Sequence, residues 1–152
     1  MNIFNIAVQI AESNFLNLSP HEFDQSANGW RKLVGFTDQA EAIINYLDTF
    51  AEGDKWNDSV PDGTTVRPGL LRWHAGQVLA FNNQYNEAIS LMKESKDLTD
   101  PEWNEYVDAT IAFLQNDRKK FIELTQKENY NKETLERLSR NFGKPYEVAY
   151  ED

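Results

Sequence analysis

The sequence predicts an all-α protein. Apolar residues recur at steps of three and four along most of the chain, as on the buried face of an amphipathic helix. No segment alternates convincingly between apolar and polar residues at period two, which a half-buried strand would require. The chain has 152 residues, of which 40% are hydrophobic and 12% aromatic, so it can bury a core of its own. We therefore expect a single helical domain over residues 1–152, with about seven or eight helices.

The N-terminal part carries two helix signals. Apolar residues recur at helical spacing across residues 4–15, which gives one apolar stripe. Ser19 then reads as an N-cap, Pro20 as a first-turn proline and Glu22 as a capping-box acid. A second helix is therefore expected to begin there.

A turn separates this second helix from the next one. The Asn-Gly pair that ends at Gly29 is a turn signal, and we expect a break there, followed by a short helical turn over residues 30–34. Thr37 and Glu41 mark another helix start. The apolar positions that follow predict a helix that ends near Gly53.

Residues 52–69 form the one linker-like stretch, with two prolines, three glycines and no period in eighteen residues. Two interpretations stay open: a flexible surface connector, or a lid that carries Trp56 and Arg67 over a groove. Beyond this loop the helices follow one another across short turns. They are expected at residues 69–82, 85–96, 101–115, 117–127 and 131–140, and Gly143 and Pro145 mark the last end.

Residues 69–127 contain an internal repeat. In LLRWHAGQVLAFNNQYNEAISLM, residues 70–92, the small Gly76 on the first helix is placed to face Ala88 on the second. Phe121 stands where a second copy would have Ala88, so that second pair is expected to be splayed or shifted. The copies are offset by 33 residues and match Trp73 with Tyr106, Gly76 with Ala109, Val78 with Ile111, Phe81 with Leu114, Asn83 with Asn116 and Ile89 with Ile122.

This pattern resembles the tetratricopeptide repeat, a helix pair of about 34 residues. The best-formed repeats are residues 69–100 and 101–127, and the resemblance implies a short tetratricopeptide-like array of antiparallel helix pairs. The segments GWRKL, LRWHAGQ, WNEYVDATIAFLQND and FGKPYEVAY also resemble a family of uncharacterised bacterial proteins of this length, with a tetratricopeptide-like helical fold and no assigned activity. That resemblance implies the architecture and a bacterial origin, and no catalytic residue.

Some side chains are not needed for packing within a helix pair and are candidates for a binding surface. Trp73 and Gln77 share one face of their helix, and the resemblance to tetratricopeptide repeats implies that this face lines a concave groove. Aromatic rings with amide and hydroxyl groups suit an extended or helical peptide. The other interpretation is that Trp73 and Tyr106 are core residues between helix layers. The candidate groove residues are Trp30, Arg72, Trp73, Gln77, Tyr106 and Thr110.

Two further segments bear on this groove. Trp30 begins the basic cluster Trp-Arg-Lys, which can clamp an anionic group near a groove or simply lie at a helix edge. The acidic and aromatic tail over residues 144–152 is a candidate to fold back along the helices or into the groove itself.

Asp108 interrupts an apolar run in the middle of a predicted helix, where a charge costs stability unless it is paired. If the two repeats stack in parallel, its nearest basic candidates are Arg72 and His74. Such a contact would be either a structural clasp or the start of an acid-base site.

Charge and composition exclude several classes of function. Fifteen basic and 25 acidic residues give a net charge of −10, which repels nucleic acid and anionic lipid. No apolar run is long enough to span a bilayer, and the N-terminus lacks the charged start of a signal peptide, so we expect a cytoplasmic protein without a membrane partner. The chain has no cysteine and only two histidines, and neither a metal-binding motif nor a phosphate-binding loop occurs. No metal or cofactor is expected.

The function that fits best at this level is a protein or peptide interaction module with a concave helical-repeat groove, and not an enzyme. The alternative is a small-molecule-binding or hydrolytic protein that uses Arg72, His74 and Asp108 under the 52–69 loop. A third possibility is a structural subunit that self-associates through an exposed apolar face. The sequence identifies neither a specific partner nor the oligomeric state.

Overall fold

The structure, a computed structural model, describes residues 14–50, 56 and 66–152. Within these ranges it contains eight α-helices, one 3-10 turn and no strand, so the predicted all-α class is confirmed. The helix predicted over residues 4–15 and the 52–69 loop lie largely outside the described residues. The elements are α2 (Pro20–Gln25), η1 (Trp30–Lys32), α3 (Phe36–Thr49), α4 (Pro68–Phe81), α5 (Tyr85–Glu94), α6 (Pro101–Leu114), α7 (Arg118–Leu124), α8 (Lys132–Arg140) and α9 (Tyr146–Glu151).

Several helices begin where capping residues predict. At α2 the Ser19 hydroxyl accepts the backbone N–H of Glu22 at 3.2 Å, and the Glu22 carboxylate accepts the backbone N–H of Ser19 at 3.0 Å. These two bonds form the predicted capping box. Asp100 and Asp117 cap α6 and α7, and each accepts a backbone N–H from its helix at 3.0 Å.

The helices of the two central pairs are spaced as the sequence repeat is. α4 and α6 each have 14 residues and begin at a proline, and α5 and α7 also begin 33 residues apart. Asn83 and Asn116, at equivalent positions after α4 and α6, have φ values of 59° and 57°. In both turns the N–H of the following residue donates to the carbonyl five residues earlier, at 2.9 and 2.8 Å. This left-handed C-cap reverses the chain in the same way in each pair.

Small residues allow α4 and α5 to pack closely. A Cβ atom at Gly76 would lie 2.9 Å from the carbonyl oxygen of Ala88 and 3.0 Å from the Met92 side chain, so only glycine fits without a shift. The second pair differs because α7 has seven residues where α5 has ten. Its Phe121 is buried and packs on Phe142, with ring centroids 5.3 Å apart.

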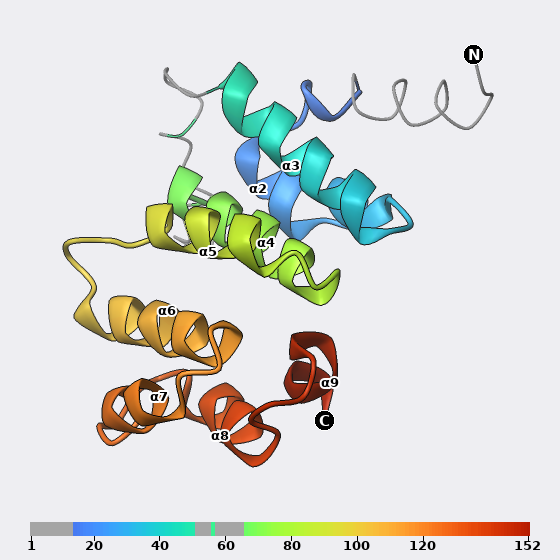
Figure 1. Cartoon of the computed structure of the whole chain (residues 1–152). Helices are drawn as coiled ribbons and strands as arrows, with labels where there is room; N and C mark the ends of the chain where they lie inside the picture. Colours follow the sequence, from blue (N-terminus) through green and yellow to red (C-terminus); the bar gives the residue numbers. More distant parts are fainter. Residues whose placement is uncertain (1–13, 51–55, 57–65) are drawn as a thin grey trace.

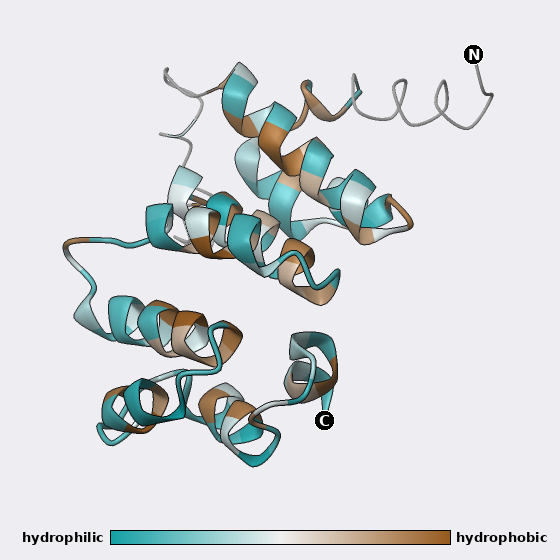
Figure 2. Cartoon of the chain, viewed as in Figure 1, coloured by the Kyte–Doolittle hydropathy of each residue, from teal (hydrophilic) through white to brown (hydrophobic). Residues whose placement is uncertain are grey.

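The helices are stacked in layers (Figure 1). α3 and α5 both pack on α4, α6 and α7 form the next pair, and α8 packs on α6. α9 then turns back and packs on both α8 and α4. Hydrophobic and hydrophilic residues alternate along most helices (Figure 2), as expected where each helix buries one face. The buried apolar side chains form one cluster that runs through all of these layers.

Candidate functional site

The predicted groove is not an open surface. Trp73 is only 3% exposed and Tyr106 4%, and Thr110 is completely buried. The rings of Trp73 and Tyr106 lie 5.0 Å apart, and Trp103 packs against both of them, at 5.0 and 5.6 Å. The prediction that Trp73, Tyr106 and Thr110 line a groove is therefore wrong, because these side chains fill the space between the α4 and α6 layers.

Helix α9 covers the remainder of that predicted surface. Tyr146 is completely buried, and its ring stacks on Phe81 with centroids 5.4 Å apart. The half-buried Gln77 amide donates to the Tyr146 hydroxyl at 3.5 Å, and the Tyr85 hydroxyl accepts the Tyr146 backbone N–H at 3.1 Å. Burial raises the pKa of Tyr146. The C-terminal segment thus lies where a bound peptide was expected.

Arg72, His74 and Asp108 do not meet. The Asp108 carboxylate lies 2.5 Å from the Lys96 ammonium, and the Arg72 guanidinium lies 3.5 Å from the Glu94 carboxylate. The predicted clasp or acid-base site of Arg72, His74 and Asp108 is therefore wrong. The reason is geometric: Asp108 faces the connection that follows α5, and Arg72 faces the end of α5, so each finds a nearer partner.

The carboxylate that does pair with His74 is Asp24 of α2. Asp24 is completely buried, and its Oδ1 lies 2.7 Å from Nδ1 of His74 and accepts the indole N–H of Trp30 at 3.0 Å. Gln25 donates to its other oxygen, Oδ2, at 2.5 Å, and the Arg31 guanidinium lies 3.8 Å from Oδ1. This Asp24 cluster joins α2 and η1 to α4.

Opposing effects act on the pKa of Asp24. Burial raises it, but the hydrogen bond and charge of His74, the indole of Trp30 and the charge of Arg31 lower it by more, so the pKa lies below its ordinary value of 3.8. Asp24 is therefore held as a carboxylate. Sequence reasoning missed it because its partner His74 is 50 residues away and Asp24 itself lies in a polar run.

Trp30 belongs to this buried cluster and not to a groove. It is 6% exposed, its ring centroid lies 5.8 Å from that of His74, and the Arg31 guanidinium lies over it at 4.1 Å. Its predicted place in a binding groove is therefore wrong. An Asp-His pair is one component of acid-base sites, but here both oxygens of Asp24 serve contacts between helices.

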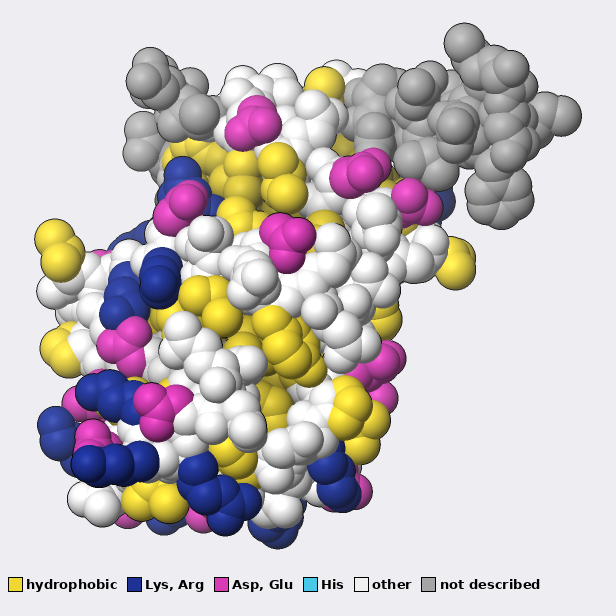
Figure 3. All heavy atoms as spheres, in the orientation of Figure 1, with side chains coloured by type: hydrophobic (Ala, Val, Ile, Leu, Met, Phe, Trp, Pro, Cys, Tyr) yellow, Lys and Arg dark blue, Asp and Glu magenta, His cyan; other side chains and the backbone are white. Residues whose placement is uncertain are grey.

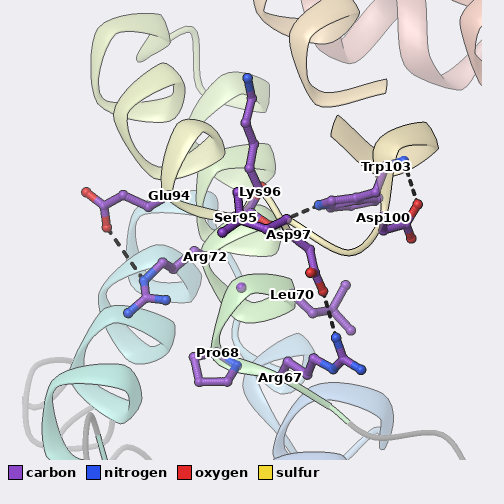
Figure 4. Close-up of a pocket in the computed structure, with 12 residues that line it drawn as sticks. Arg67, Pro68, Leu70, Arg72, Glu94, Ser95, Lys96, Asp97, Asp100 and Trp103 are labelled. Carbon is purple, nitrogen blue, oxygen red and sulfur yellow. Dashed lines mark hydrogen bonds and ion pairs between the residues drawn. The ribbon is translucent and has the colours of Figure 1, made fainter. Parts of the chain in front are cut away.

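The largest pocket in the described part of the chain lies beside the connection between α5 and α6, and we call it the 95–100 pocket (Figure 4). Its volume is about 510 Å³, and it is lined by the start of α4, the end of α5, residues 95–100 and Trp103. Of the predicted site residues, only Arg72 lines it. Positive and negative side chains balance around it, because Arg67 pairs with Asp97 at 2.6 Å and Arg72 pairs with Glu94.

The connection that borders this pocket is held by hydrogen bonds. The Asn104 side chain accepts the backbone N–H of Asp97 at 2.9 Å and donates to its carbonyl at 2.7 Å. The Asp97 carboxylate accepts the backbone N–H and the hydroxyl of Thr99, at 2.8 and 2.7 Å. These bonds, followed by the pairing with Arg67, lower the pKa of Asp97. Leu98, between these anchored residues, is fully exposed.

Sequence reasoning treated this connection as an ordinary turn between helices. A single signal was present, an isolated leucine in the polar run KESKDLTD. One exposed leucine is common on protein surfaces, so only the hydrogen bonds around it and the adjacent pocket make it informative.

Metal and membrane readings find no support in the described ranges. Residues 14–50, 56 and 66–152 contain no group of three or more His, Asp or Glu side chains placed to hold a metal ion. Across the same ranges, no helix has the length and apolar character needed to cross a bilayer.

Comparisons with known protein families, with curated proteins and with solved structures find no match. The two resemblances drawn from the sequence therefore stay predictions, and the function has to be argued from the geometry of this chain.

Proposed function

We propose that this protein is a protein or peptide interaction module of the tetratricopeptide-like type, and that it contacts its partner at the 95–100 pocket. The observation that carries the proposal is Leu98. Its side chain is fully exposed on a connection that hydrogen bonds hold on both sides of it. Burying a leucine contributes about 1.5–3 kcal/mol, and a residue held in place loses little freedom on binding.

The surroundings of Leu98 fit a binding surface for protein. Leu70 and Trp103 contribute partly buried apolar area to the pocket, and ion pairs surround it. An apolar centre with a polar rim is the usual arrangement at protein interfaces. We place this module in the cytoplasm, and we propose no catalytic role for any residue.

The alternative of a small-molecule-binding or hydrolytic protein loses its support because its three residues lie in separate contacts. Arg72, His74 and Asp108 pair with Glu94, Asp24 and Lys96 respectively. Self-association remains an alternative, which sedimentation of the purified chain measures directly.

Substitution of Leu98 tests the proposal. We expect Leu98→Ser to fold like the wild type, within about 0.5 kcal/mol, because an exposed side chain contributes little to stability. Proteins retained by the tagged wild-type chain from an extract of its own cells should be lost with Leu98→Ser. Val34→Ser is the matched control, since Val34 is 92% exposed and lies at the start of α3. Equal recovery with both variants would contradict the proposal.

A further inference from the structure

A second surface lies between α3 and α5, away from the 95–100 pocket. Both helices pack on α4, and between them is a groove of about 440 Å³. Ala40 and Leu79 form its floor, and Ile44 of α3 and Leu91 of α5 form its apolar walls. We call it the α3–α5 groove.

The α3 wall of this groove presents one regular helix face. Thr37, Ala40, Glu41 and Ile44 line it, at steps of three, one and three residues. Seven residues of helix correspond to about 10 Å, or two turns. The groove is therefore long enough for two turns of a second helix, which would present apolar side chains at positions i, i+3 or i+4, and i+7.

Charge decides which kind of helix fits. Glu41 on α3 and Glu87 on α5 line opposite walls of the groove, and both are exposed. Neither side chain has an ion pair or hydrogen bond with any described residue, whereas Glu94 at the end of α5 pairs with Arg72. Helix α3 contains Asp38, Glu41 and Asp48 and no Lys or Arg. Figure 3 shows acidic side chains on both sides of the hydrophobic surface over α3 and α5.

We propose that the α3–α5 groove binds a basic amphipathic helix of a partner protein. The apolar face of that helix would cover Ala40, Ile44, Leu79 and Leu91, and its flanking Lys or Arg side chains would pair with Glu41 and Glu87. An acidic helix is repelled by the same carboxylates. A second copy of this chain is also disfavoured, because two molecules of net charge −10 repel each other.

The probe is a labelled 14-residue helical peptide of leucine and lysine, with Leu at i, i+3, i+4 and i+7, and its counterpart with Glu in place of Lys. Binding to the full chain is measured by fluorescence anisotropy. We expect the lysine peptide to bind, the glutamate peptide not to bind, and the affinity to fall as salt rises. Failure of the lysine peptide to bind, or equal binding of both peptides, overturns the proposal.

Three variants locate the binding surface. Glu41→Gln with Glu87→Gln should lower the affinity for the lysine peptide by about tenfold, because exposed ion pairs contribute roughly threefold each. Ser90→Trp, at an exposed position on the α5 wall, should block the groove without disturbing the core. Asp48→Asn is the matched control, since it removes an exposed acid of α3 that does not line the groove. If Asp48→Asn weakens binding as much as the double variant does, the peptide is held by net charge alone and the proposal is wrong.

The inference does not depend on the 95–100 pocket. Leu98→Ser should leave binding of the lysine peptide unchanged, so failure at one surface is separate from failure at the other. If sedimentation shows a dimer that Ser90→Trp dissociates, a second copy occupies the groove and the proposal is overturned.

Discussion

Asp24 and Asp108 are both aspartates within helices, but their surroundings differ. Asp24 is completely buried among His74, Trp30 and Gln25, whereas the Asp108 side chain is 38% exposed beside an equally accessible Lys96. Removing one member of a buried charge pair leaves its partner without compensation, while exposed pairs contribute little. The two positions thus offer a matched comparison.

We expect Asp24→Asn to lower the free energy of unfolding by about 3 kcal/mol. Asp108→Asn should lower it by less than about 1 kcal/mol, because water screens that pair. Urea unfolding of both variants at neutral pH measures the difference. Equal losses would show that the Asp24 cluster does not hold α2 and η1 against α4.

The difference between wild type and Asp24→Asn should also depend on pH. The pKa of Asp24 is lowered in the folded protein, so its stabilising contribution is fully present above the unfolded-state pKa of about 3.9. It is lost as the pH falls through the lower, folded-state pKa. We therefore expect the two unfolding free energies to converge in acid and to differ most above about pH 4.

At this scale the sequence predicted that a carboxylate pairs with His74, but it selected the wrong carboxylate. Asp108 attracted notice because it interrupts an apolar run, yet a helix packed on several sides still has one accessible strip, and Asp108 lies on it. Asp24 drew no attention because its burial depends on the position of α4, which no local pattern encodes.

Among the helical elements, the two left-handed asparagines are the most direct consequence of the repeat. Asn83 and Asn116 both have positive φ after equivalent helices, a conformation that costs most other residues about 1–2 kcal/mol.

We expect Asn83→Ala and Asn116→Ala each to destabilise the protein by about 1 kcal/mol, because alanine tolerates a positive φ less well than asparagine. The double variant should show the sum of the two losses, since the sites belong to separate helix pairs. Thermal unfolding of the three variants tests this. Asn82→Ala, at the preceding exposed position with φ of −89°, is the control and should have a smaller effect.

The elements themselves were largely predictable. Caps and prolines placed the starts of α2 and α6, and predicted helices 69–82 and 101–115 correspond to Pro68–Phe81 and Pro101–Leu114. Helix α9 was not predicted. Tyr146, Val148 and Tyr150 alternate as in a strand, but Tyr146 and Tyr150 are also four residues apart, and only packing against α4 and α8 selects the helical spacing.

Over the whole molecule, α9 joins layers that lie far apart in sequence. Tyr146 packs on Phe81 of α4 and on Phe113 of α6, with ring centroids 5.4 and 6.1 Å away. This is why the groove suggested by the repeat pattern could not be assessed from the sequence: the pattern describes each helix pair and not what a later segment covers.

We expect Tyr146→Ala to destabilise the protein by about 3–5 kcal/mol, the range for a large buried aromatic side chain. Near-ultraviolet circular dichroism of the Trp73 and Trp103 cluster should report the same transition as far-ultraviolet signals, because one core links the layers. Val148→Ala, on the half-exposed side of the same helix, should cost less than about 1 kcal/mol. Similar losses in both variants would mean that α9 is not part of the core.

The return of α9 to α4 has a consequence for how the protein is made. Tyr146 is translated 65 residues after Phe81, the ring on which it stacks. At about 5–20 residues per second, several seconds of synthesis separate the two. During that interval the aromatic faces of Phe81 and Phe113 lack their cover on the ribosome-bound chain. The nascent protein therefore exposes a sticky surface that the finished molecule hides, and it should need protection from aggregation for longer than its helical content suggests.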